Sequence, residues 1–124
     1  CSATMNAVTK VAIIDDESDL NEVIQHFLTS IGVPSQCFTN AEVALEAIGN
    51  GEGWTLVLSD IRMPGMTGPD LLSQMIARGI KTPIVFMSGH VEESLHKQVL
   101  AKGARGLLFK PFDFKEIVGY LKSA

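Results

Sequence analysis

Two hydrophobic patterns alternate along this chain, and the alternation restricts the folds that are open to it. Five runs rich in β-branched and apolar residues are typical of buried strands, and they span residues 8–15, 35–38, 54–59, 82–88 and 105–110. Apolar residues at helical spacing occupy the segments that follow these runs, at residues 18–32, 40–51, 68–79, 90–103 and 113–122. Alternating strands and helices predict a parallel sheet covered by helices on both faces. Because crossovers between parallel strands are right-handed, we expect a doubly wound α/β fold with strand order 2-1-3-4-5.

Local signals indicate where the helices begin and end. Ser18 is a candidate N-cap for the first helix, and Gly32 is placed to end that helix. Asn40 is a candidate cap for the second helix, and Pro69 suits the first turn of the third. The fourth helix, residues 90–103, carries only a thin apolar stripe.

Length and composition suit one folded domain, because the chain has 124 residues of which 46% are hydrophobic and 19% charged. We assign residues 8–124 to it and expect residues 1–7, which lack periodicity, to be disordered or artificially added. The net charge of −4 argues against a nucleic-acid surface on this domain. No apolar run approaches the ~20 residues that span a bilayer, and no signal peptide begins the chain, so we expect no membrane attachment by this domain. Cys1 and Cys37 form no disulfide or metal motif, which favours a cytoplasmic location with Cys37 as a small core residue.

Polar side chains follow four of the predicted strands at the point where each ends. Asp15 and Asp16 follow the first strand, Asp60 follows the third, Ser88 ends the fourth and Lys110 ends the fifth. Ligands of open parallel sheets bind at the carboxyl ends of the strands. We therefore expect these five residues to converge in one cleft.

The expected cleft combines three carboxylates with a cation and a hydroxyl. Like charges a few ångströms apart raise one another's pKa, and a divalent cation such as Mg²⁺, which prefers hard oxygen ligands, would relieve that repulsion. Lys110 and Ser88 add groups that bind an anion. Together they indicate a place for a phosphoryl group beside a carboxylate that can attack it. These residues also have ordinary interpretations. Asp15 and Asp16 could be an acidic pair that stabilises a helix N-terminus. Ser88 could be a turn residue, and Lys110 a surface lysine.

Four motifs at these strand ends resemble those of receiver domains of two-component response regulators. They are "IIDDES", "LSDIRMPGMTG", "MSG" and "LLFKPF", in the order typical of that family. The resemblance covers essentially residues 8–122. It implies a CheY-like, flavodoxin-like (βα)5 fold, which agrees with the expected sheet order.

For the metal, the resemblance implies a Mg²⁺ ion held by the acidic residues and one backbone carbonyl. Asp16 matches the direct acidic ligand of the family, and Asp15 matches its acidic partner. Asp60 is the third carboxylate at the metal. Arg62 matches the position whose backbone carbonyl ligates the metal.

For the phosphoryl group, the resemblance implies that Asp60 is the phosphoacceptor. Its donor would be the phosphohistidine of a histidine kinase or of a histidine phosphotransfer domain. Ser88 matches the switch hydroxyl that moves toward the phosphoryl oxygens, and Lys110 matches the lysine that pairs with them. The Lys110–Pro111 bond is similar to one that is often cis in the family, and we predict a cis bond here.

The sequence departs from the family pattern at Leu107, where most members have an aromatic residue or histidine that acts as a switch. We therefore expect the signal to travel through the loop after Ser88 and the helix at 90–103. The surface formed by that helix, the strand at 105–110 and the helix at 113–122 is expected to support homodimerisation or partner docking. Among the charged residues that it carries are Lys97, Lys102, Arg105, Lys115 and Glu116.

Three other functions compete with a phosphorylated signalling module that is not a turnover enzyme. A phosphatase with an aspartyl nucleophile usually has a second aspartate two residues later, where this chain has Arg62. A flavin-binding module would need a phosphate loop, and "DDES" would repel phosphate. A receiver-like protein–protein interaction module that works without phosphorylation remains the alternative. Of the histidines, His26 and His96 are expected at solvated helix positions.

Overall fold

Five strands and five helices alternate along the part of the chain that the computed structural model describes, which comprises residues 10–50, 53–63, 65–89, 93–110 and 112–123. The elements are β1 (Lys10–Ile14), α2 (Ser18–Ser30), β2 (Ser35–Phe38), α3 (Ala41–Asn50), β3 (Trp54–Asp60), α4 (Gly68–Ala77), β4 (Ile84–Ser88), α5 (Glu93–Lys102), β5 (Gly106–Phe109) and α6 (Phe114–Ser123). The segment at 1–7, for which a disordered or added N-terminus was predicted, lies outside the described residues. Within the described ranges, none of the helices has the length and apolar character that crossing a membrane requires.

The strands form one parallel sheet in the order β2-β1-β3-β4-β5, which confirms the predicted topology. Ile13 of β1 lies between Cys37 of β2 and Leu58 of β3 in the register. Leu58 in turn pairs with Val85 of β4. The central strands are β1, β3 and β4, and their near-continuous apolar sequences suit strands that are covered on both faces.

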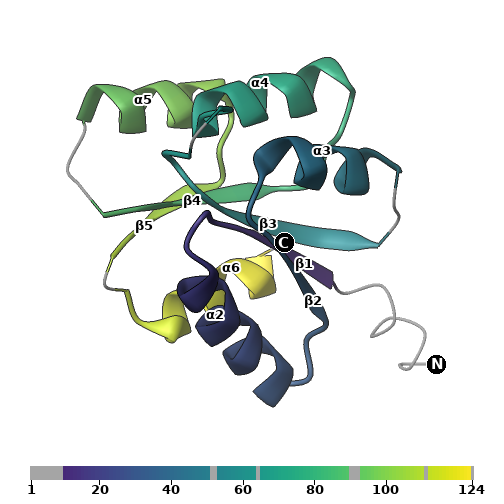
Figure 1. The fold of residues 1–124 in the computed structure, drawn as a ribbon. Coiled ribbons are helices and arrows are strands. Elements are labelled where there is room, and N and C mark those ends of the chain that lie inside the picture. The colour runs from purple at the N-terminus through teal and green to yellow at the C-terminus, as the bar shows by residue number, and fades with distance from the viewer. Residues whose placement is uncertain (1–9, 51–52, 64, 90–92, 111, 124) are drawn as a thin grey trace.

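Helices cover both faces of the sheet, with α3, α4 and α5 on one side and α2 and α6 on the other (Figure 1). Alternate strand residues supply the two cores, because successive side chains of a strand point to opposite faces. Ala12 and Ile14 pack in the core under α3, α4 and α5. Val11 and Ile13 pack in the core under α2 and α6. On that second face, Phe27 of α2 stacks on Phe114 of α6 with ring centroids 4.7 Å apart.

The helix ends agree with the sequence signals except at the start of α2. Asn40 accepts hydrogen bonds from the backbone N–H groups of Glu42 and Val43, as expected for a cap of α3. Gly32 follows α2 with φ +79°, the left-handed conformation expected after a helix. The prediction for Ser18 was wrong, because Glu17 occupies the N-cap position and Ser18 is the first helical residue. Glu17 makes no side-chain capping bond.

Backbone hydrogen bonds continue beyond the strands and hold their carboxyl ends side by side. The N–H of Asp15 donates to the carbonyl of Phe38 at 3.0 Å, and the N–H of Lys110 donates to the carbonyl of Ser88 at 2.7 Å. The N–H of Ile61 donates to the carbonyl of Met87 at 2.9 Å. Residues that follow three different strands are therefore fixed at one edge of the sheet.

Candidate functional site

Asp60 is the last residue of β3 and is 9% exposed, so its carboxylate lies at the rim of the core. Burial raises the pKa of the Asp60 carboxyl above its ordinary value. The charge of Lys110 opposes this rise, Asp15 and Asp16 add to it, and a hydrogen bond from the N–H of Arg62 lowers the pKa. The site thus holds a carboxylate whose negative charge is only partly compensated.

The chain turns sharply after Asp60 and then begins α4. Gly65 has φ +85°, a conformation that favours glycine. Gly68 is glycine for another reason, because its φ is not positive and an added Cβ would lie 2.9 Å from the carbonyl oxygen of Ile61. Thr67 caps α4 and forms a capping box with Asp70.

Three carboxylates converge as expected, because one oxygen each of Asp15, Asp16 and Asp60 lie within 4.8 Å of one another. Asp15 is fully buried and accepts a hydrogen bond from the N–H of Glu17 at 2.9 Å. Asp16 is exposed. This set of hard oxygen donors fits Mg²⁺, because Asp16 is exposed and Asp60 lines a cleft, so that water ligands can reach the cluster.

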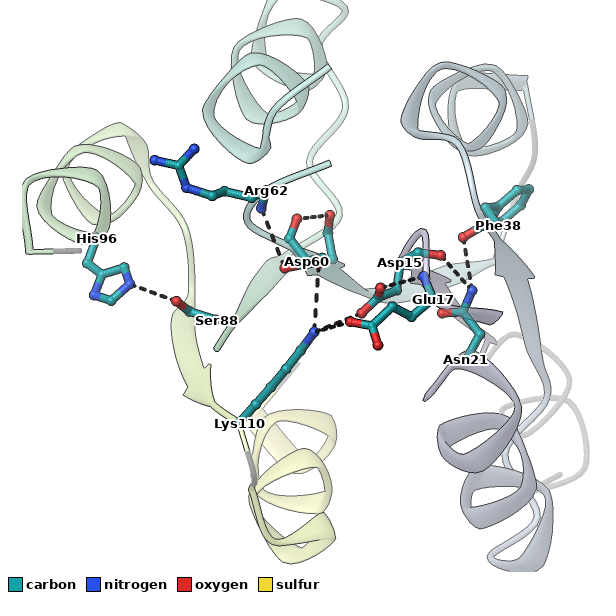
Figure 2. Close-up of polar contacts among 10 residues, drawn as sticks. Asp15, Glu17, Asn21, Phe38, Asp60, Arg62, Ser88, His96 and Lys110 are labelled. Carbon is teal, nitrogen blue, oxygen red and sulfur yellow. Dashed lines mark hydrogen bonds and ion pairs between the residues drawn. The ribbon is translucent and has the colours of Figure 1, made fainter. Parts of the chain in front are cut away.

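Lys110 extends from the end of β5 into this acidic cluster, as Figure 2 shows. Its ammonium lies 3.1 Å from Asp15 Oδ2, 3.7 Å from Asp60 Oδ2 and 4.0 Å from Glu17 Oε1. Burial lowers the pKa of this ammonium, but the hydrogen bond and charge of Asp15, with the charges of Asp60 and Glu17, outweigh it and raise the pKa. Lys110 therefore stays charged and holds the buried Asp15 in an ion pair.

Ser88 ends β4, is 2% exposed, and has its hydroxyl beside a histidine. Its Oγ lies 3.1 Å from Nε2 of His96 on α5. His96 is 7% exposed, so the prediction of a solvated position was wrong for this residue, whereas His26 is exposed as predicted. His96 stands three residues before Val99, the other buried residue of α5, and this spacing was the signal that sequence reasoning missed.

A cleft of about 290 Å³ opens between these groups. Its walls are Glu17, Asp60, Ile61, Arg62, Ser88, Gly89 and Lys110. Leu107 lies away from the cleft lining and packs, partly buried, against the core under α3, α4 and α5. Pro111, for which a cis bond was predicted, lies outside the described residues.

Asn21 is a supporting residue that sequence reasoning did not find. Its side-chain amide is buried in α2 and donates to the backbone carbonyls of Asp15, at 2.8 Å, and Phe38, at 3.3 Å. It thereby ties the ends of β1 and β2 together and positions the acidic loop. Its place directly after the apolar Leu20 at the start of the first helix gave little indication of this role.

Comparison with known proteins gives the family. The model of the response regulator receiver domain matches residues 11–122. The chain belongs to the response regulator receiver domain family. This receiver domain is therefore a module of two-component signal transduction, as its four strand-end motifs implied.

Relatives of this receiver domain are longer proteins. It is 32% identical over 114 residues to the response regulator protein TodT of Pseudomonas putida, covering 92% of this chain and 50% of TodT. It is 34% identical to the DNA-binding transcriptional regulator NtrC of Escherichia coli, again over 92% of this chain but only 24% of NtrC. The chain thus spans half or less of these two relatives.

The fold is shared with solved structures of response regulator receivers. A receiver protein from Pseudomonas putida superposes with a TM-score of 0.87 at 24% identity, over 94% of this chain and 97% of that one. At this identity the likeness shows the fold alone. It agrees with the sheet order and the helix layers described above.

Proposed function

We propose that this receiver domain accepts a phosphoryl group on Asp60 and changes conformation in response. The observation that supports the proposal is the meeting of Asp15, Asp16, Asp60 and Lys110 at one edge of the sheet, with Ser88 across the cleft. A carboxylate nucleophile, a cation and a hydroxyl are the groups that phosphoryl transfer to a carboxylate requires.

Asp16 and Asp60, with Asp15 behind them and the backbone carbonyl of Arg62, are the residues that would hold Mg²⁺. The ion would neutralise the three carboxylates and the charge of the transferring phosphoryl group. Asp15 would support the metal site mainly by holding Lys110 in place, because Oδ2 of Asp15 accepts a hydrogen bond from the Lys110 ammonium at 3.1 Å. Mg²⁺ dependence follows from the repulsion among the acids.

In the transfer step, a carboxylate oxygen of Asp60 forms a bond to phosphorus while the P–N bond of a phosphohistidine breaks. The electron pair of that bond goes to the donor imidazole, which leaves as the neutral ring when its other nitrogen is protonated. Lys110 and the hydroxyl of Ser88 stabilise the phosphoryl oxygens. The product is an acyl phosphate on the domain itself, so the domain is a stoichiometric acceptor and not a turnover enzyme.

Phosphorylation changes the charge of the cleft and so the balance between two conformations. The acyl phosphate carries roughly −1.5 to −2 charges in place of the single charge of the carboxylate, which strengthens contacts to Lys110 and Ser88 in one of them. Ser88 ends β4 next to β5, and β5 leads into α6. The surface formed by α5, β5 and α6 is therefore the part that we expect to change, and to support a homodimer or an output partner. Leu107 takes part by repacking.

The proposed phosphodonor is a histidine kinase or a histidine phosphotransfer domain. Because TodT and NtrC extend well beyond the matched region, an output domain is proposed as the target of the switch. DNA contact would belong to such an output domain, since this one carries a net charge of −4. A cytoplasmic location remains a prediction.

Intact mass spectrometry tests the proposal. The wild type is incubated with a small acyl phosphate, with Mg²⁺ or with EDTA, alongside Asp60→Asn. We expect a gain of one phosphoryl mass only in the wild type with Mg²⁺. No gain under conditions where Mg²⁺ is bound would overturn the proposal and favour the phosphate-independent interaction module.

A further inference from the structure

We propose that His96 is a latch: it holds the hydroxyl of Ser88 on the α5 side of β4 and thereby opposes phosphorylation of Asp60. This inference rests on the proposed function of the site. It makes His96 a positioning residue, because His96 acts on Asp60 only through Ser88. It also assigns a role to a buried histidine that the phosphoryl-transfer step itself does not use.

The contact between His96 and Ser88 is well protected from water. Oγ and Nε2 are 3.1 Å apart, and the two residues are 2% and 7% exposed. The ring of His96 also packs edge-on against Phe109 of β5, with centroids 5.3 Å apart and an interplanar angle of 69°. The imidazole is thus held from two sides, by the hydroxyl and by an aromatic ring.

The direction of the Ser88 side chain decides the sign of the effect. Figure 2 shows the hydroxyl pointing to His96 and away from Asp60. In this orientation, a contact between the Ser88 hydroxyl and a phosphoryl group on Asp60 requires the side chain to turn away from His96. This requirement holds for either tautomer of His96, because it concerns the position of Oγ and not the direction in which the proton is shared.

Release of Ser88 would change the α5–β5 surface through the same histidine. Once Ser88 turns toward the cleft, Nε2 of His96 loses this partner in a buried place, which favours a new position of the ring. That ring packs on Phe109 of β5, a residue that is 51% exposed. A movement of the His96–Phe109 pair would then signal phosphorylation at the surface. Leu107 cannot provide this signal as an aromatic switch residue would, because it has no ring.

Affinity for beryllofluoride, a phosphoryl mimic, in the presence of Mg²⁺ tests the latch. The variants are His96→Leu, the surface control His26→Leu, Ser88→Ala, and the double variant that combines Ser88→Ala with His96→Leu. We expect His96→Leu to bind about fivefold more tightly, the equivalent of one net hydrogen bond, and His26→Leu to match the wild type. In the Ser88→Ala background, we expect the substitution at His96 to change affinity less than about twofold, since the pair is already broken.

The outcomes distinguish failure of the latch from failure of the proposed phosphoryl acceptance by Asp60. If the wild type binds no beryllofluoride and takes no phosphoryl group, the proposed function fails. If the wild type binds, but His96→Leu binds equally or more weakly, or its gain persists in Ser88→Ala, the latch is overturned. Nitrogen NMR of the wild-type His96 ring tests the latch without a variant: its Nε2 signal should shift on beryllofluoride binding, and an unchanged signal would contradict the latch.

Discussion

Asp60 is a carboxylate in surroundings that disfavour its negative charge. Burial raises the pKa of its carboxyl, and two further carboxylates have oxygens within 4.8 Å of one of its own. Lys110 compensates in part, but its ammonium is closer to Asp15, at 3.1 Å, than to Asp60, at 3.7 Å. The protein groups of the cleft therefore carry excess negative charge, which suits them to bind a cation.

Asp60→Asn should stabilise the metal-free domain at pH 7. Because the pKa of Asp60 is raised on folding, the folded state binds more protons than the unfolded state above about pH 4, and stability falls as pH rises through that window. Asparagine avoids this loss, so we expect a gain of about 1 kcal/mol at pH 7 that shrinks toward about pH 4. Urea unfolding in EDTA measures it. Asp19→Asn, at an exposed position on α2, is the control, and equal stability of Asp60→Asn and wild type would contradict the account.

Lys110→Met should destabilise the domain, because it leaves the buried Asp15 carboxylate without its cation. We expect a loss of about 1–3 kcal/mol at pH 7. Since the pKa of Lys110 is raised, its contribution is complete below its unfolded pKa of about 10.4 and is lost only as the pH rises through the folded value. Lys102→Met removes an exposed lysine of α5 that bonds to Ser73, and should change stability by less than about 0.5 kcal/mol. Equal effects of the two variants in denaturant titrations would show that the Asp15 pair contributes nothing.

At the scale of single elements, the junction between β3 and α4 is held by a hydrogen bond and a helix cap. The N–H of Gly68 donates to the carbonyl of Ile61 at 2.8 Å, which closes the turn that follows Asp60. The capping box of Thr67 and Asp70 then fixes the first turn of α4. The position of Asp60 therefore depends on how closely α4 approaches the end of β3.

Gly68→Ala should disturb this junction and slow phosphorylation of Asp60. Its Cβ would lie 2.9 Å from the carbonyl oxygen of Ile61 and 2.8 Å from Cε1 of Phe86, so the backbone must shift. We expect a loss of about 1–3 kcal/mol, typical of overpacking. Gly119→Ala is the matched control, since an added Cβ meets nothing within 4 Å on α6 and should stabilise by up to about 1 kcal/mol. Thermal unfolding and the rate of mass gain measure both, and a stabilising Gly68→Ala would contradict the described junction.

At the scale of the whole molecule, the sheet brings together groups that are distant in sequence. Asp15 and Lys110 are 95 residues apart along the chain and are joined by one hydrogen bond. The two hydrophobic cores hold the strands in register, and the site exists only while that register is kept. A ligand that bridges these groups should therefore stabilise the entire domain.

Mg²⁺ should raise the melting temperature of the wild type. At a concentration of ten times Kd, the expected stabilisation is about 1.4 kcal/mol. Asp16→Asn should lose most of this response, because it removes the exposed carboxylate of the cluster. Scanning calorimetry with and without Mg²⁺ measures the effect. A response of the same size in Asp16→Asn would place the ion elsewhere.

Much of this architecture is predictable from the sequence because strand patterns and helix patterns alternate without interruption. The convergence of Asp15, Asp60 and Lys110 follows from the parallel sheet, in which all carboxyl ends meet at one edge. His96 was missed because a polar residue on a thin apolar stripe resembles a solvated one until its partner is known. The close approach at Gly68 was missed for a similar reason, since it depends on the packing of α4 against β3 and Phe86 and not on the turn itself.

The identity of the phosphorylated residue is the most direct test of this account. An acyl phosphate is reduced by borohydride to the corresponding alcohol, so phosphorylated Asp60 would become homoserine. After incubation with a small acyl phosphate and Mg²⁺, reduction and proteolysis, tandem mass spectrometry should find homoserine at position 60 and unmodified Asp15 and Asp16. Homoserine at another position, with Asp60 unchanged in protein that has gained a phosphoryl mass, would contradict the assignment of Asp60 as the acceptor.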